Sequence, residues 1–131
     1  MKPFDKNTLI LGKEIFLSPI EEKDKMRFVS YLGIAWDFKP ELQVKANAED
    51  LILKQFGEVC SIRLNTDNTL IGWLALSDGE NEFQYDIYTF LFDVYKGDGY
   101  GKDAISAMLG FLSKKADIDS VSVQFTQDIE N

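Results

Sequence analysis

The stretch 91–112 constrains the fold most, because an apolar run there breaks into a glycine-dense turn and resumes as an amphipathic pattern. Before the turn, residues 88–95 are rich in β-branched and aromatic side chains, which favour a buried strand. After the turn, apolar residues recur at the spacing of one helical face, namely Ala104, Ile105, Met108, Leu109 and Leu112. The pattern predicts a strand, a loop and a helix, in that order.

Three alternating glycines mark the loop: Gly97, Gly99 and Gly101, separated by Asp98 and Tyr100. Glycine adopts positive φ angles easily and lets a bulky ligand approach the backbone. Successive amide N–H groups, together with the positive end of the following helix dipole, favour a phosphate or pyrophosphate. The loop is therefore predicted to bind an anion; the alternative is a glycine-rich turn without a ligand.

The spacing of these glycines excludes two common phosphate motifs. A Walker A loop ends in Gly-Lys-Ser/Thr, whereas Asp103 follows Gly101 and Lys102 here, so the hydroxyl that binds Mg²⁺ is missing. The dinucleotide fingerprint requires Gly-x-Gly-x-x-Gly, which these positions do not match.

Length and composition exclude several classes of protein and of catalytic site. A chain of 131 residues fits a single domain. Without histidine, it has no Ser-His-Asp triad and no histidine-based zinc site, and its one cysteine, Cys60, allows no internal disulfide. The 22 acidic and 14 basic residues give a net charge of −8, which argues against a nucleic-acid partner. That charge suits an amine acceptor, with plain solubility as the alternative.

No apolar run is long enough to span a membrane, and the amino terminus lacks the apolar region of a signal peptide. We expect no membrane partner and a cytoplasmic location.

The rest of the sequence predicts an α+β fold. We expect a strand over 14–19, a helix from Glu22 to about Tyr31 with Met26, Val29 and Leu32 facing inward, and a second helix over 47–56. Residues 59–64 and 69–76 predict a β-hairpin around the polar turn 65–68, and the central strand is expected over 82–94. A last strand is expected over 120–125.

Residues 96–101, Lys-Gly-Asp-Gly-Tyr-Gly, resemble the acyl-CoA signature of the GNAT superfamily of N-acetyltransferases, Gln/Arg-x-x-Gly-x-Gly/Ala. Lys96 stands where the family usually has Gln or Arg. The phrase Leu70-Ile71-Gly72 is also similar to the start of the family's third strand. The resemblance implies a single GNAT-like domain over 1–131, with a mixed, mostly antiparallel sheet flanked by helices. Relative to the family, the sequence would lack the last helix and two strands.

The resemblance also implies a cofactor site for acetyl-CoA (CoA). The pyrophosphate would lie on the amides from Gly97 to Lys102, and a backbone N–H within 92–94 would hold the thioester carbonyl. The cofactor-binding residues are then Phe92, Val94, Lys96, Gly97, Asp98, Gly99, Tyr100, Gly101 and Lys102.

For catalysis, the resemblance implies a direct attack of an amine on the thioester, assisted by a carboxylate on or beside the central strand. The candidate bases are Asp86 and Asp93, with Glu82 behind them; the alternative is that they are surface or structural acids. Trp36, Asp37 and Phe38 are candidate contacts to the acceptor, unless the two aromatic residues only fix their loop to the core. The tyrosine that often serves as general acid in the family has no counterpart here.

An apolar strand over 120–125 would be an exposed sheet edge, which predicts a homodimer or a partner chain that covers it. The first functional hypothesis is an N-acetyltransferase acting on a small-molecule or protein amine. A second is a non-catalytic GNAT-like module that binds CoA or a partner protein. A third is an unrelated α+β protein whose loop binds a nucleotide phosphate.

Overall fold

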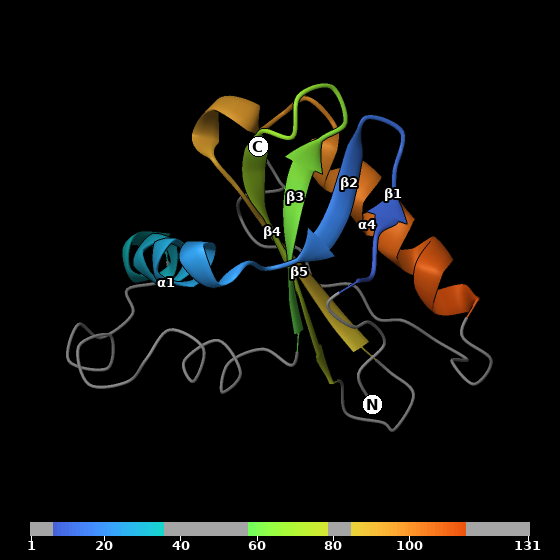
Figure 1. The fold of residues 1–131 in the computed structure, drawn as a ribbon, viewed down its shortest axis with the longest axis horizontal. Helices are drawn as coiled ribbons and strands as arrows, with labels where there is room; N and C mark the ends of the chain where they lie inside the picture. The colour runs from blue at the N-terminus through green and yellow to red at the C-terminus, as the bar shows by residue number, and fades with distance from the viewer. Residues whose placement is uncertain (1–6, 36–57, 79–84, 115–131) are drawn as a thin grey trace.

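The computed structural model describes residues 7–35, 58–78 and 85–114 (Figure 1). Their elements follow in the order β1 (Ile10–Leu11), β2 (Ile15–Pro19), α1 (Glu22–Ala35), β3 (Glu58–Leu64), β4 (Leu70–Asp78), β5 (Tyr85–Leu91), the 3₁₀ turn η1 (Asp93–Tyr95) and α4 (Tyr100–Ser113).

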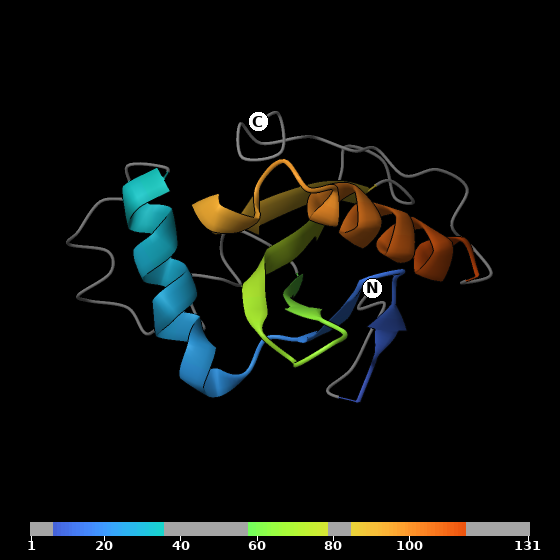
Figure 2. The ribbon, with the colours of Figure 1, turned by 90° about the horizontal axis from the view of Figure 1, so that it is seen from above.

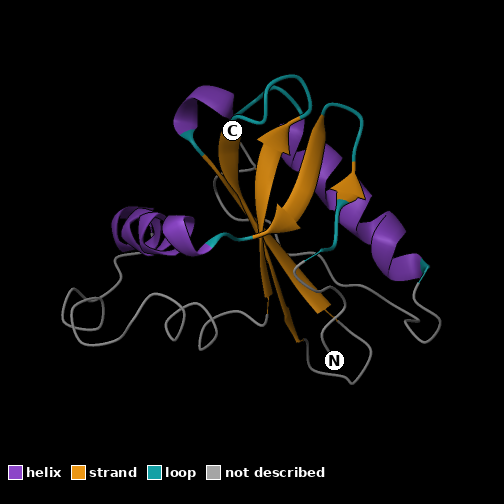
Figure 3. Cartoon of the chain, in the orientation of Figure 1, coloured by secondary structure: helices purple, strands orange, loops and turns teal. Residues whose placement is uncertain are grey.

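The described strands form one sheet in the order β1-β2-β3-β4-β5, and every neighbouring pair is antiparallel (Figure 3). Figures 1 and 2 show α1 and α4 on opposite sides of this sheet. The turns β1–β2 and β3–β4 and the segment leading from β5 to α4 all lie at one end of the sheet, at the top of Figure 1. This end is the one that carries the glycine-dense loop.

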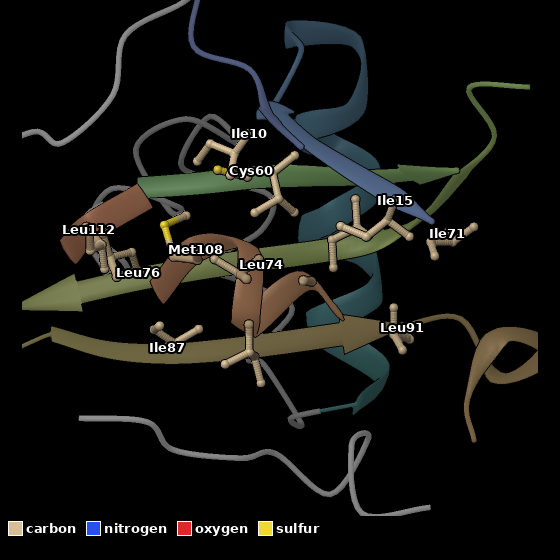
Figure 4. Packing of buried hydrophobic residues seen from close by; sticks show 14 residues of the cluster. Ile10, Ile15, Cys60, Ile71, Leu74, Leu76, Ile87, Leu91, Met108 and Leu112 are labelled. Atoms are coloured by element: carbon tan, nitrogen blue, oxygen red, sulfur yellow. The ribbon is translucent and has the colours of Figure 1, made fainter. Parts of the chain in front are cut away.

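The core under α4 is aliphatic. Figure 4 shows Met108 and Leu112 of α4 in the same cluster as Leu74, Leu76 and Ile87 of the strands. All five side chains are at most 2% exposed. Their period-two spacing along the strands and one-face spacing along the helix explain why this sequence buries α4 against the sheet.

The core under α1 is aromatic. Trp73 of β4 and Phe90 of β5 are fully buried and face each other across the two strands. Phe28 of α1 covers both rings, with centroids 5.1 Å from Trp73 and 5.6 Å from Phe90. Aromatic pairs at these distances stabilise more than their buried area alone.

The structure confirms the α+β class, the strand over 14–19 and the β-hairpin of 59–64 with 69–76. Two predictions within these elements were wrong. Helix α1 continues to Ala35 instead of ending near Tyr31, and its buried face carries Phe28, whereas the side chain of Met26 is 52% exposed. The central strand ends at Leu91 rather than at Val94, because residues 93–95 turn into η1. The predicted helix over 47–56 and the predicted strand over 120–125 lie outside the described residues.

Candidate functional site

The glycine-dense loop joins η1 to α4 and turns through two left-handed residues. Gly97 has φ 87° and Gly99 has φ 86°, so glycine is the residue these positions favour. Gly101 differs from the prediction: it lies in the first turn of α4, where it is buried and helical. Gly101 therefore does not supply a left-handed turn of the loop.

The first amides of α4 point towards the N-terminal end of the helix and have no acceptor among the described residues. The first hydrogen bond that closes the helix runs from Asp103 N–H to the Gly99 carbonyl, at 3.0 Å, and no side chain caps the helix. The N–H groups of Tyr100, Gly101 and Lys102 therefore have no intrahelical partner. No hydrogen bond to another described residue engages them either.

No described residue crowds the start of this helix at Gly99. A Cβ atom built on Gly99 would have no described atom within 4 Å. An anion could therefore approach the free N–H groups closely, at the positive end of the α4 dipole.

The charged side chains of the loop are not equivalent. Lys96 Nζ lies 2.8 Å from Asp93 Oδ1, and the side chain of Lys96 is 16% exposed while that of Asp93 is 94% exposed. Asp93 thus offsets the charge of Lys96 at the rim of the loop. Lys102 and Asp98 are exposed, and no ion pair joins either one to the rest of the described chain.

The backbone after β5 offers two further donors. Phe92 N–H, one of the groups expected to hold a thioester carbonyl, already donates to the Ile71 carbonyl at 3.0 Å and is not available. The amides of Tyr95 and Lys96 close η1 on the carbonyls of Phe92 and Asp93. The N–H groups of Asp93 and Val94 remain without an acceptor in the described part of the chain.

The two candidate bases lie far apart: Asp86 is near the start of β5, and Asp93 follows its end, as the first residue of η1. Asp86 pairs with Ser77 near the start of the strand, and a rise of about 3.4 Å per residue places it about 17 Å from Leu91. Asp93 lies beside the loop, but its carboxylate holds Lys96. The structure therefore does not bring Asp86 and Asp93 together. Glu82, Trp36, Asp37 and Phe38 lie outside the described residues.

Two side chains that shape the loop were missed from the sequence. Asp103, in the first turn of α4, accepts backbone hydrogen bonds from Lys13 N–H at 2.9 Å and Glu14 N–H at 2.8 Å. Tyr31 of α1 donates its hydroxyl to the Leu91 carbonyl at 3.2 Å. Neither contact could have been read from spacing, since the partners lie 60 or more residues apart; only the position of Asp103 in a first helical turn was a signal.

Within the described ranges, no cluster of three or more metal-ligating side chains is found. None of the described helices has the length and apolar character needed to cross a membrane.

Comparison with solved structures identifies the fold. A GNAT-family acetyltransferase from Bacillus anthracis matches with a TM-score of 0.67 and 19% identity, over 88% of this chain and 72% of that one. An acetyltransferase from Agrobacterium tumefaciens matches with a TM-score of 0.66 and 14% identity, over 90% and 74% of the two chains. RimL, a ribosomal-protein alpha-N-acetyltransferase solved in complex with coenzyme A, matches with a TM-score of 0.64 and 16% identity, over 88% and 73%.

The chain thus has the GNAT fold, as the resemblance of residues 96–101 implied. No protein-family model matches the sequence, and comparison with curated proteins gives no significant match. At these identities the likeness concerns the fold, and the chemistry has to be argued from the loop itself.

Proposed function

We propose that the chain binds an acyl-CoA, with acetyl-CoA as the simplest case, and transfers the acyl group to a primary amine. The observation that carries this proposal is the row of N–H groups from Gly97 to Lys102, from which no described residue accepts a hydrogen bond and which follows β5 in a GNAT fold. A Cβ atom at Gly99 would have no described atom within 4 Å, so no described residue fills the space beside these groups. These amides, the α4 dipole and Lys102 would hold the pyrophosphate.

In this proposal the thioester carbonyl would accept from the N–H groups of Asp93 and Val94, which no described acceptor engages, because Phe92 N–H is engaged by Ile71. The amine nitrogen attacks the carbonyl carbon, and the N–H donors stabilise the negative charge that develops on its oxygen. The C–S bond then breaks, the thiolate leaves as CoA after taking up a proton, and the amine gives up its own proton to base or water.

A second candidate function is binding without turnover. It is favoured by the position of the two carboxylates: Asp86 lies about 17 Å along β5 from Leu91, at the end of the strand that is far from the loop, and Asp93 is held by Lys96. Under this proposal the same loop binds CoA, and the chain acts as a sensor or as a subunit of a complex.

Calorimetric titration with acetyl-CoA tests the shared part of both candidates. Gly99→Asp and Gly99→Asn form a matched pair, since Asp and Asn both tolerate a positive φ and differ mainly in charge. We expect micromolar binding by the native chain, modest weakening in Gly99→Asn and loss of binding in Gly99→Asp. Gly110→Asp places the same charge at an open position on the far part of α4 and is expected to bind like the native chain.

Release of free CoA in the presence of a panel of amines then separates the candidates. Amine-dependent release supports transfer, and binding without release supports the second candidate. Absence of binding to acetyl-CoA, with binding to a nucleotide such as ATP, would contradict both.

A further inference from the structure

The peptide unit between Leu91 and Phe92 is held by hydrogen bonds at both of its polar atoms. Its carbonyl accepts the Tyr31 hydroxyl at 3.2 Å, and its N–H donates to the Ile71 carbonyl at 3.0 Å. One bond comes from α1 and the other from β4, so two separate elements fix the plane of this peptide.

This peptide determines where the next N–H groups point. The amides of Asp93 and Val94 follow it directly, at the start of η1, and neither is engaged by a described acceptor. Both donors belong to η1, which is closed by the bonds from Tyr95 N–H to the Phe92 carbonyl and from Lys96 N–H to the Asp93 carbonyl. Rotating the peptide at Leu91 would therefore rotate this turn and both donors with it.

The ring of Tyr31 is held firmly enough to place its hydroxyl. It packs against Trp73, Phe90 and Phe92, with ring centroids 5.8, 6.1 and 6.2 Å away. At 3.2 Å the O–H···O contact is longer than most hydrogen bonds between two oxygen atoms, so it adds little to the stability of the fold.

We propose that Tyr31 is a positioning residue: its hydroxyl sets the peptide between Leu91 and Phe92 so that the N–H groups of Asp93 and Val94 meet the acyl carbonyl of the cofactor. This inference rests on the proposed function, since it assigns the carbonyl contact of that site. Tyr31 itself need not touch the cofactor.

Tyr31→Phe removes the hydroxyl and keeps the ring. Because the loop amides from Gly97 to Lys102 are untouched, affinity for CoA is expected to stay within about 2-fold of the native value. Affinity for acetyl-CoA is expected to fall about 5-fold, which corresponds to the loss of one ordinary hydrogen bond. Tyr88→Phe, on the same face of the sheet, removes a hydroxyl away from this peptide and serves as the control.

The second measurement is the infrared stretching frequency of the acetyl carbonyl in bound acetyl-CoA, which is labelled there with carbon-13. A general loss of protein stability would not change this frequency. A hydrogen bond to the carbonyl lowers this frequency. We expect a lowered frequency with the native chain and with Tyr88→Phe, and a return toward the solution value with Tyr31→Phe.

The outcomes separate the two proposals. If the native chain binds CoA and lowers the carbonyl frequency but Tyr31→Phe behaves identically, the role of Tyr31 is wrong and the cofactor site stands. An unshifted carbonyl in the native chain, with CoA bound, also overturns the role of Tyr31. If the native chain binds neither CoA nor acetyl-CoA, the proposed function fails and the inference fails with it.

Discussion

Asp103 Oδ2 accepts a 2.8 Å hydrogen bond from the backbone N–H of Glu14, which lies 89 residues earlier in the chain. The other carboxylate oxygen accepts Lys13 N–H at 2.9 Å. One side chain in the first turn of α4 thus fixes the β1–β2 turn against the helix start that forms the candidate anion site.

We expect Asp103→Ala to lower the free energy of unfolding by about 2 kcal/mol, because two charge-assisted hydrogen bonds are lost at a partly exposed position. Urea denaturation measures the change. Asp98→Ala removes an exposed carboxylate from the neighbouring loop and is expected to change stability by less than about 0.5 kcal/mol. Equal effects of the two substitutions would show that the Asp103 contacts contribute nothing specific.

Gly72→Ala is expected to destabilise the sheet by about 3 kcal/mol, a severe case of overpacking. A Cβ atom at Gly72 would lie 2.1 Å from the Phe90 carbonyl oxygen, so β4 and β5 would have to separate. The matched control is Gly110→Ala on α4, where a Cβ meets nothing within 4 Å. There alanine should stabilise by up to about 1 kcal/mol through its higher helix propensity. Thermal unfolding of both variants should therefore shift in opposite directions; destabilisation by both would contradict the prediction.

The ion pair between Asp24 and Arg63 should couple α1 to the β3–β4 hairpin. Arg63 Nη2 lies 3.1 Å from Asp24 Oδ2, and the two side chains are only 16% and 10% exposed. Removing one partner leaves a buried charge, so Asp24→Ala is expected to cost about 3 kcal/mol. A double-mutant cycle with Arg63→Met should give a coupling free energy above about 1 kcal/mol.

The exposed pair of Lys23 with Glu21 is the control for that cycle. Its atoms are 3.3 Å apart, and the two side chains are 75% and 52% exposed. Its coupling should stay below about 0.5 kcal/mol, as for other ion pairs in contact with solvent. If the coupling free energy of Asp24 and Arg63 is no larger than this value, their ion pair does not couple α1 to the β3–β4 hairpin.

Cys60 should be unreactive in the folded protein. Burial raises the pKa of its thiol, and the charge of Glu58 raises it further, so the reactive thiolate does not form at pH 8. We expect a disulfide reagent to label Cys60 only after denaturation. Rapid labelling of the native chain would contradict the buried position.

The same raised pKa makes stability depend on pH. The unfolded thiol loses its proton near pH 8.5, whereas the folded thiol keeps it. The contribution of the buried, neutral thiol to the free energy of unfolding is therefore fully present below about pH 8.5 and declines as the pH rises above this value. Comparing the free energy of unfolding at pH 7.5 and pH 9.5 should show a smaller decline in Cys60→Ala than in the native chain.

Local sequence patterns predicted much of this fold. The hairpin of β3 and β4, the start of α1 at Glu22 and the apolar face of α4 follow from alternation, an acidic first turn and one-face spacing. The end of β5 did not, because Val94 and Tyr95 have strand-forming side chains but their backbone turns into η1. Strand propensity describes a side chain's fit to a pleated surface and does not locate the residue where the chain leaves it.

Only those features of the candidate site that depend on residues close together in the sequence could be predicted. The glycine spacing led us to expect the left-handed Gly97 and Gly99, and also amides at the start of α4 that no described residue engages. The engagement of Phe92 N–H by Ile71 and the bond from Tyr31 to Leu91 depend on how distant segments pack, which no local pattern encodes.

The most direct test of the central claim is amide NMR of the native chain during titration with CoA. The account predicts that the largest shifts fall on the N–H groups from Gly97 to Lys102, since no described residue accepts a hydrogen bond from these donors in the loop and the first turn of α4. The amides at the other end of α4, near Ser113, should remain in place. Shifts that avoid residues 97–102, or no shifts at saturating CoA, would contradict the assignment of this loop as a cofactor site.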